Sequence, residues 1–145
     1  MPLVQKSALV PYAADRMFAL VEDFERYTEF LPWCAGAEVL SRDNSLVLAR
    51  LDIDYRGIRQ SFTTENINFP GEAINMRLRD GPFKKLEGGW KFNALAPAAS
   101  KVELTLDYAF ANALLEKAVG PVFSYISNTM VERFVARADQ LYREP

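Results

Sequence analysis

The hydrophobic pattern of this chain changes its period once, near residue 111, and this change limits the folds that the chain can adopt. Five segments before that point alternate apolar and polar residues, over 46–55, 58–67, 73–80, 86–94 and 101–110. A period of two is typical of strands that bury one face and leave the other in water. Consecutive strands of this kind predict an antiparallel meander.

After that point the apolar residues recur every three or four positions, from Asn112 to about Tyr142. This spacing predicts one long helix. Gly120 and Pro121 interrupt the pattern. Because a proline inside a helix removes a backbone hydrogen bond and crowds the preceding turn, we expect a kink there. Three shorter elements are predicted upstream, namely a strand over 3–10 and helices over 13–24 and 26–31.

Together these elements predict a single α+β domain spanning residues 1–145, a usual size for one domain. Its strongly curved antiparallel sheet is accompanied by two short N-terminal helices. One long, kinked C-terminal helix lies across the concave face. A curved sheet and a helix need not close tightly on each other, so we expect a hydrophobic cavity between them.

Apolar side chains on the inner face of the sheet and on the facing stripe of the helix are candidate walls for this cavity. Gly88 occupies an inward strand position and is expected to leave a gap in the core. Methionine is flexible, so Met76 and Met130 would make an adaptable wall. The alternative is ordinary core packing, and the pattern alone leaves both open. The candidate ligand-binding residues are Phe30, Leu31, Trp33, Phe62, Met76, Leu78, Trp90, Phe92, Val122, Phe123, Ile126 and Met130.

Three of these candidates belong to a short aromatic segment, 27–34, which is broken by Pro32. The segment is expected either to pack as a cap over one end of the core or to act as a lid at the cavity mouth. As an exposed apolar edge it would also suit transient contact with a membrane surface or a partner.

A second candidate surface follows the tight turn Asp80-Gly81-Pro82. There Phe83 stands beside Lys84 and Lys85. An exposed aromatic ring next to paired lysines suits an anionic lipid head group or a nucleic-acid phosphate. The alternative is a solvated hairpin tip with no partner.

The rarity of catalytic side chains favours binding over catalysis. The chain has no histidine and one cysteine, Cys34, which excludes Ser-His-Asp and Cys-His devices, Cys/His zinc sites and an internal disulfide. Asp52 and Asp54 share a strand face, but it is the solvent face. We therefore expect no catalytic residue, no metal and no cofactor, and hence no enzymatic activity.

The charge balance argues against a general polyanion binder. The chain carries 17 Lys and Arg against 19 Asp and Glu, a net charge of −2, so DNA is not an expected partner. The sequence shows neither a secretory signal nor a run of apolar residues long enough to cross a membrane. We therefore expect a cytoplasmic protein.

Several segments resemble the coenzyme Q-binding branch of the START superfamily, the polyketide cyclase/dehydrase-like proteins. The most specific is DGPFKKLEGGWKF at 80–92. Weaker likenesses are ALVPY at 8–12, YTEFLPWC at 27–34, FTT at 62–64 and the closing helix at 119–142. The likeness runs from about residue 3 to residue 142.

This resemblance implies a helix-grip fold around a hydrophobic tunnel. It also implies binding or transport of ubiquinone or a related prenylated quinone, in support of respiration and at times at the inner membrane. An alternative is implied by the ribosome association toxins of the same branch, which bind the large ribosomal subunit and block subunit joining. The candidate contacts for a ribosome are Lys84, Lys85, Lys91, Arg133 and Arg137.

Overall fold

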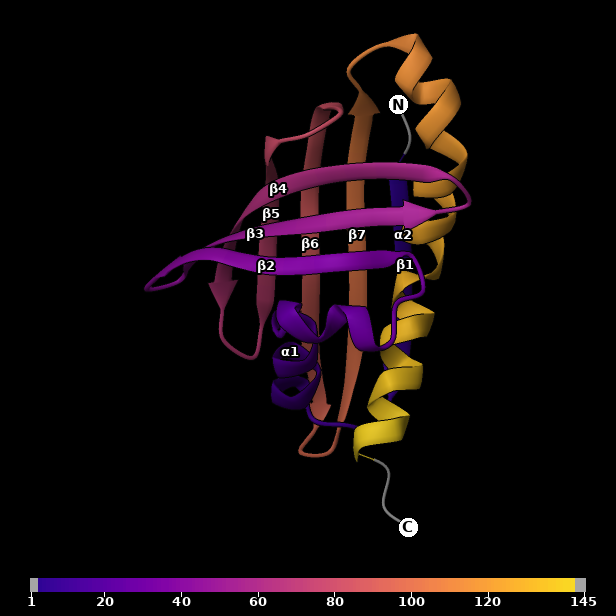
Figure 1. Ribbon diagram of the computed structural model, residues 1–145. Helices are drawn as coiled ribbons and strands as arrows, with labels where there is room; N and C mark the ends of the chain where they lie inside the picture. The colour runs from indigo at the N-terminus through magenta and orange to yellow at the C-terminus, as the bar shows by residue number, and fades with distance from the viewer. Residues whose placement is uncertain (1–2, 143–145) are drawn as a thin grey trace.

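A seven-stranded antiparallel sheet in the order β1-β7-β6-β5-β4-β3-β2 dominates the computed structural model, which describes residues 3–142 (Figure 1). The expected domain spans 1–145, of which residues 1–2 and 143–145 lie outside the described part. The elements are β1 (Leu3–Val10), α1 (Ala14–Glu22), the 3-10 helix η1 (Phe24–Glu29), β2 (Cys34–Asp43), β3 (Leu46–Tyr55), β4 (Ile58–Phe69), β5 (Ala73–Asp80), β6 (Phe83–Ala96), β7 (Ala99–Phe110) and α2 (Ala113–Tyr142).

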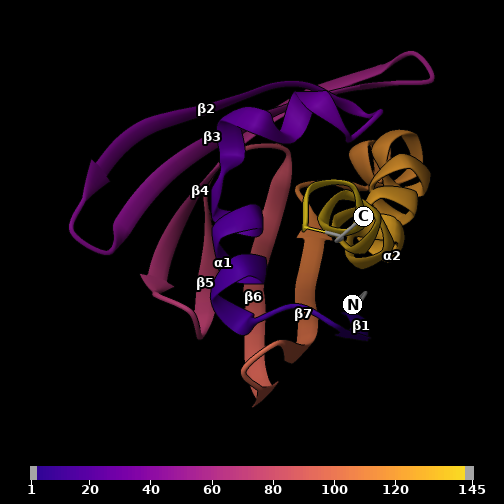
Figure 2. The same ribbon diagram turned by 90° about the horizontal axis from the view of Figure 1, so that it is seen from below.

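The sheet is curved so strongly that β2, β3 and β4 cross in front of β6 and β7 in Figure 1. Seen from below, the strands form an open trough, with α1 in its mouth (Figure 2). Helix α2 lies between β1 and β7 on one side and the far end of β3 and β4 on the other, and it contacts β1, β7 and β4. The predicted curved sheet, short helices and long C-terminal helix are confirmed.

The alternating pattern correctly predicts which strand face is buried. Every second residue of β7 is buried, from Val102 through Phe110. The facing stripe of α2 includes Val119, Phe123 and Phe134, which are also buried. These side chains form one continuous hydrophobic core between the sheet and the helix.

One strand, β2, is missing from the sequence-based prediction. Its burial pattern explains the omission, because Cys34 is its only buried residue and the others are half-buried or exposed. Register shifts between Cys34 and Gly36 and between Val39 and Ser41 also break the period of two. An edge strand with little to bury and an interrupted period leaves no alternating signal.

Helix α2 begins and bends as its sequence predicts. The side-chain oxygen of Asn112 accepts a hydrogen bond from the backbone N–H of Leu115 at 2.9 Å, the geometry of an N-cap. The helix continues through Pro121 without a break, and its axis is visibly curved in Figure 1.

No helix within residues 3–142 is long and apolar enough to cross a membrane.

The expectation that Gly88 leaves a gap in the core is wrong. Its φ is +148°, and a Cβ added to it would lie 2.0 Å from the backbone oxygen of Thr105. At Gly89, with φ +158°, an added Cβ would lie 2.1 Å from the backbone oxygen of Ile74. The glycine pair thus lets β6 approach both neighbouring strands closely, where the sheet is already strongly curved.

Candidate functional site

A small cavity of about 50 Å³ lies between the sheet, η1 and α2. A water molecule's share of liquid volume is about 30 Å³, whereas pockets for drug-sized ligands measure about 300–1,000 Å³. In this conformation the cavity therefore has room for one or two water molecules but not for a quinone ring. It is lined by Phe24, Tyr27, Trp33, Ala49, Leu51, Phe62, Thr64, Met76, Leu86, Trp90, Leu106, Phe123, Ile126, Ser127 and Met130.

Only part of the predicted ligand-binding set lines this cavity. Seven of its members line the wall, namely Trp33, Phe62, Met76, Trp90, Phe123, Ile126 and Met130. The other five, Phe30, Leu31, Leu78, Phe92 and Val122, do not. The prediction also omits Phe24, Tyr27, Ala49, Leu51, Thr64, Leu86, Leu106 and Ser127. Leu51, Leu86 and Leu106 belong to the same alternating pattern, so the strand period could have placed them on the wall.

The aromatic segment 27–34 packs as a cap over the core. The side chains of Leu31 and Trp33 are each 1% exposed. The hydroxyl of Tyr27 donates to the backbone oxygen of Val21, and the ring of Phe30 meets that of Phe134 edge-on at 5.1 Å. This packing is what the cap interpretation predicts, and Tyr27 and Trp33 of the same segment also line the cavity, as the lid interpretation predicts. In this conformation the segment offers no broad apolar edge to a membrane.

The cavity wall contains no charged side chain among the described residues. Its polar members are few, and the Ser127 hydroxyl donates to the backbone oxygen of Phe123 at 2.8 Å. Within residues 3–142, the indole N–H of Trp33 has no protein hydrogen-bond partner. Nearby on β4, both amide atoms of the fully buried Asn66 also lack one. The site can thus select a guest by shape, with two or three polar groups to orient it.

The titratable groups next to the cavity are held neutral. Burial raises the pKa of Tyr27 well above its usual value, and electrostatic interaction with the nearby Cys34 raises it further. Burial also raises the pKa of the Cys34 thiol to about 11. Since the thiolate is the reactive form of cysteine, a pKa this high leaves the Cys34 thiol protonated and weakly reactive at neutral pH.

The expectation of an exposed aromatic ring at Phe83 is wrong. Phe83 is 5% exposed, because it begins β6 on the inner face and stacks on Phe110 at 5.0 Å. It also meets Phe123 at 4.9 Å. Its neighbour Lys85 is neutralised by Asp107 at 2.8 Å. The hydrogen bond to Asp107 is the main cause of the raised pKa of Lys85.

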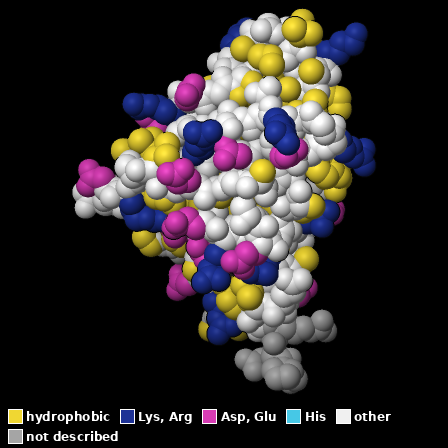
Figure 3. All heavy atoms as spheres, in the orientation of Figure 1, with side chains coloured by type: hydrophobic (Ala, Val, Ile, Leu, Met, Phe, Trp, Pro, Cys, Tyr) yellow, Lys and Arg dark blue, Asp and Glu magenta, His cyan; other side chains and the backbone are white. Residues whose placement is uncertain are grey.

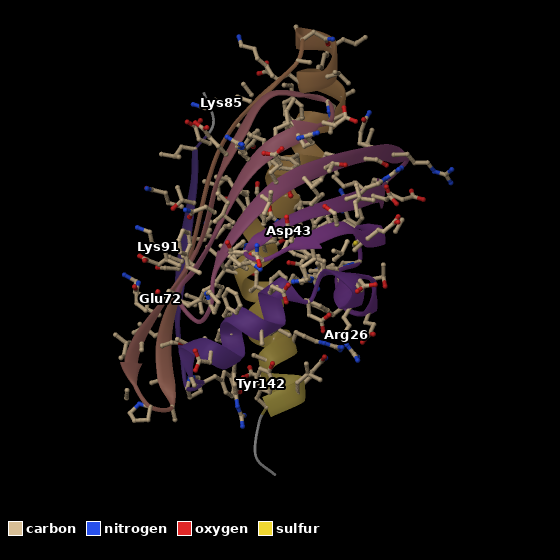
Figure 4. All side chains as sticks on the ribbon, turned by 90° about the vertical axis from the view of Figure 1, so that its left-hand side faces the viewer. Arg26, Asp43, Glu72, Lys85, Lys91 and Tyr142 are labelled. Atoms are coloured by element: carbon tan, nitrogen blue, oxygen red, sulfur yellow. The ribbon has the colours of Figure 1, made fainter. Side chains whose placement is uncertain are left out.

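The basic residues proposed as ribosome contacts do not form one patch. Lys85 and Lys91 lie on the outer face of the sheet, away from α2 (Figure 4). Arg137, on α2, pairs with Glu29 at 2.6 Å, and its side chain is only 14% exposed. Arg133 lies on the same helix and donates to the hydroxyl of Tyr125. Lys84 is exposed at the start of β6.

A curved antiparallel sheet that grips a long helix around an apolar interior defines a helix-grip, START-like domain. The comparisons with known proteins agree, and residues 10–135 match the family described as polyketide cyclase / dehydrase and lipid transport. The chain belongs to this family.

Among its relatives, the ribosome association toxin RatA of Pseudomonas aeruginosa is 45% identical over 139 residues, which is 96% of each chain. RatA of Escherichia coli strain K12 is 43% identical, over 98% of this chain and 90% of its own length. A mitochondrial coenzyme Q-binding protein COQ10 homologue of Xenopus laevis is more distant. It is 23% identical over 94% of this chain and 58% of its own length.

Two solved structures show the same fold. The Zhui aromatase/cyclase of a Streptomyces species superimposes with a TM-score of 0.85 at 19% identity, covering 98% of this chain and 96% of its own. A START superfamily protein from Mycobacterium smegmatis gives a TM-score of 0.75 at 26% identity, covering 96% and 98%. At 19% identity, the likeness to the aromatase/cyclase concerns the fold alone.

Proposed function

We propose that this chain is a ribosome association factor that binds the large ribosomal subunit and hinders its joining to the small one. The observation that carries the proposal is the similarity to RatA, which extends over nearly the whole of both chains. In such a protein the outer surface makes the contacts with the ribosome, and the interior needs only to be stable. Binding of this kind takes place where ribosomes are, in the cytoplasm.

The interior is consistent with this role. A cavity of about 50 Å³ leaves little room for a substrate, and no charged side chain in the described part of the chain reaches its wall. General acid–base catalysis requires a titratable group within hydrogen-bond reach of the reacting atom. We therefore propose a binding function without enzymatic activity.

Overexpression of the chain in bacterial cells is expected to shift ribosomes from 70S particles to free 50S and 30S subunits. The physical reason is competition, because a protein bound to the large subunit lowers the concentration of subunits able to join. The measurement is a sucrose-gradient profile of the lysate. Cells that express the same gene with an early stop codon are the control. An unchanged ratio of 70S to free subunits at high expression would contradict the proposal.

The cavity favours a second candidate function, the binding of a hydrophobic molecule such as a prenylated quinone. Its wall is almost entirely apolar and includes two flexible methionines, Met76 and Met130. Similarity to the COQ10 homologue supports the same class of ligand. A ring would enter only after the wall moves outward, since the present volume falls several-fold short of a ligand pocket.

Purified protein is expected to release a prenylated quinone into organic solvent, where mass spectrometry detects it, if this second function holds. Added quinone should also quench the fluorescence of Trp33 and Trp90, because both indoles line the cavity. Met130→Phe narrows the cavity without adding a tryptophan and should weaken or abolish the quenching, whereas Glu103→Gln, half-buried on the outer face of the sheet, should not. Protein that carries no quinone and shows no quenching would exclude this function.

A further inference from the structure

The tip of the β3–β4 hairpin reaches across to α2 and contacts it through two aromatic rings (Figure 1). Tyr55 ends β3, and Tyr125 lies in the middle of α2. Their rings are parallel to within 2°, with centroids 5.4 Å apart. Tyr125 is 37% exposed, so this stacked pair lies at the surface and is open to solvent.

Two arginines flank the stacked rings. The guanidinium carbon of Arg56, in the hairpin turn, lies 5.4 Å from the centroid of the Tyr55 ring. On α2, Nη2 of Arg133 donates a hydrogen bond to the hydroxyl oxygen of Tyr125 at 3.1 Å. This hydrogen bond is the largest cause of a lowered pKa at Tyr125, and the charge of Arg56 lowers it further. We call these four residues the arginine–tyrosine platform.

The two arginines keep their charge free for a partner. Within residues 3–142, neither Arg56 nor Arg133 forms an ion pair with a carboxylate, whereas Arg59 nearby pairs with Asp54 at 3.4 Å. Arg137, one helical turn beyond Arg133, is likewise neutralised by its acidic partner. Figure 3 shows Lys or Arg side chains at the right-hand edge, at the height where the hairpin tip meets α2 in Figure 1.

Arg56 occupies a turn position whose backbone conformation is unfavourable for an arginine. Its φ is +51° and that of Gly57 is +81°, the two positive values of a two-residue hairpin turn. Such turns prefer Asn, Asp or Gly at the first position. The turn therefore does not explain the arginine, whose side chain lies beside the Tyr55 ring.

We propose that the arginine–tyrosine platform is the surface that contacts RNA of the large ribosomal subunit, an inference that rests on the proposed function. Unstacked bases of RNA loops bind by stacking on aromatic rings and on guanidinium planes. The planar fork of an arginine also pairs with a phosphate through two hydrogen bonds. Stacked rings with a guanidinium at each end offer both kinds of contact within one small area.

The charge distribution favours RNA over an acidic protein or a lipid surface. The chain as a whole carries −2, so a polyanion is attracted only where cations are locally uncompensated. An acidic peptide would use the guanidinium groups but not the parallel rings between them. A membrane would be met by a broad apolar edge, whereas here one guanidinium lies beside the Tyr55 ring and another bonds the Tyr125 hydroxyl.

The test is co-sedimentation of purified protein with isolated 50S subunits, comparing the wild type with the double variant Arg56→Gln/Arg133→Gln. We expect the double variant to bind about tenfold more weakly or worse, with a logarithmic salt dependence that flattens by about one for each lost phosphate contact. The matched control is Lys6→Gln/Arg16→Gln, which removes two exposed cations elsewhere. Arg16 packs on Tyr142, roughly 25 Å along α2 from Tyr125. Thermal unfolding midpoints of both double variants should stay close to that of the wild type.

The outcomes separate this inference from the proposed function. Wild-type protein that does not bind 50S subunits overturns both. If the wild type, the control and the platform variant all bind 50S subunits equally, the platform is overturned while the proposed function stands. Ultraviolet crosslinking of the wild-type complex identifies the partner class, and we expect nucleotide adducts on peptides that contain Tyr55 or Tyr125. Adducts confined to other peptides, or chemical crosslinks from the platform to a ribosomal protein alone, would overturn RNA as the partner.

Discussion

Replacing Phe123 by alanine is expected to lower the free energy of unfolding by about 3–5 kcal/mol. Phe123 is 3% exposed and faces four other rings from α2. The rings of Phe62, Phe83, Tyr108 and Phe110 all lie within 6.3 Å of it, centroid to centroid. Because strands on several sides hold these rings in place, they cannot close the hole that alanine leaves. Urea unfolding followed by circular dichroism measures the loss.

Leu114 on the same helix provides the control for Phe123. It is 76% exposed, so Leu114→Ala is expected to change the free energy of unfolding by less than about 0.5 kcal/mol. If Phe123→Ala costs less than about 1 kcal/mol, then Phe123 and the four rings around it are not the centre of the hydrophobic core.

Gly88→Ala is expected to cost about 3–5 kcal/mol or to prevent folding. The added Cβ would lie 2.0 Å from the backbone oxygen of Thr105. This oxygen cannot move away easily, because β7 is paired with β6 on one side and with β1 on the other. The φ of +148° adds strain, since side chains other than glycine rarely adopt it. Thermal unfolding of the variant is the measurement.

Gly120→Ala is the matched glycine control. Gly120 lies inside α2, and its added Cβ would meet nothing closer than the Phe110 ring at 3.8 Å. Alanine is the better helix former by about 1 kcal/mol, so this variant should be as stable as the wild type or more so. A Gly88→Ala protein with wild-type stability would show that the backbones of β6 and β7 leave room for a Cβ at position 88.

The architecture could be predicted from the sequence because it depends on two short-range periods. The buried face of β7 and the inner stripe of α2 each follow directly from the spacing of apolar residues. Strand β2 could not be found this way, because an exposed edge strand with two register shifts has no such period. The expectation of a gap at Gly88 was wrong for a related reason. A missing side chain shows in the sequence, but the closeness of the neighbouring strands does not.

The candidate site was predictable only in part. Periodicity places Trp90 and Ile126 on inner faces, but it cannot say whether the space between them is filled. That depends on how closely the helix settles on the sheet, which is decided by packing across the whole core. The turn beside Phe83 resembled an exposed tip, although the ring points inward. Tyr55 and Tyr125 are 70 positions apart, so no local pattern could bring them together.

Co-sedimentation of the purified chain with isolated 50S and 30S subunits tests the proposed function most directly. We expect the chain to move with the 50S particle, to remain near the top of a gradient that holds only 30S, and to reduce the 70S peak when both are mixed. A chain that stays at the top of the gradient in the presence of 50S particles, at concentrations where its fold is intact, would contradict a function in ribosome association.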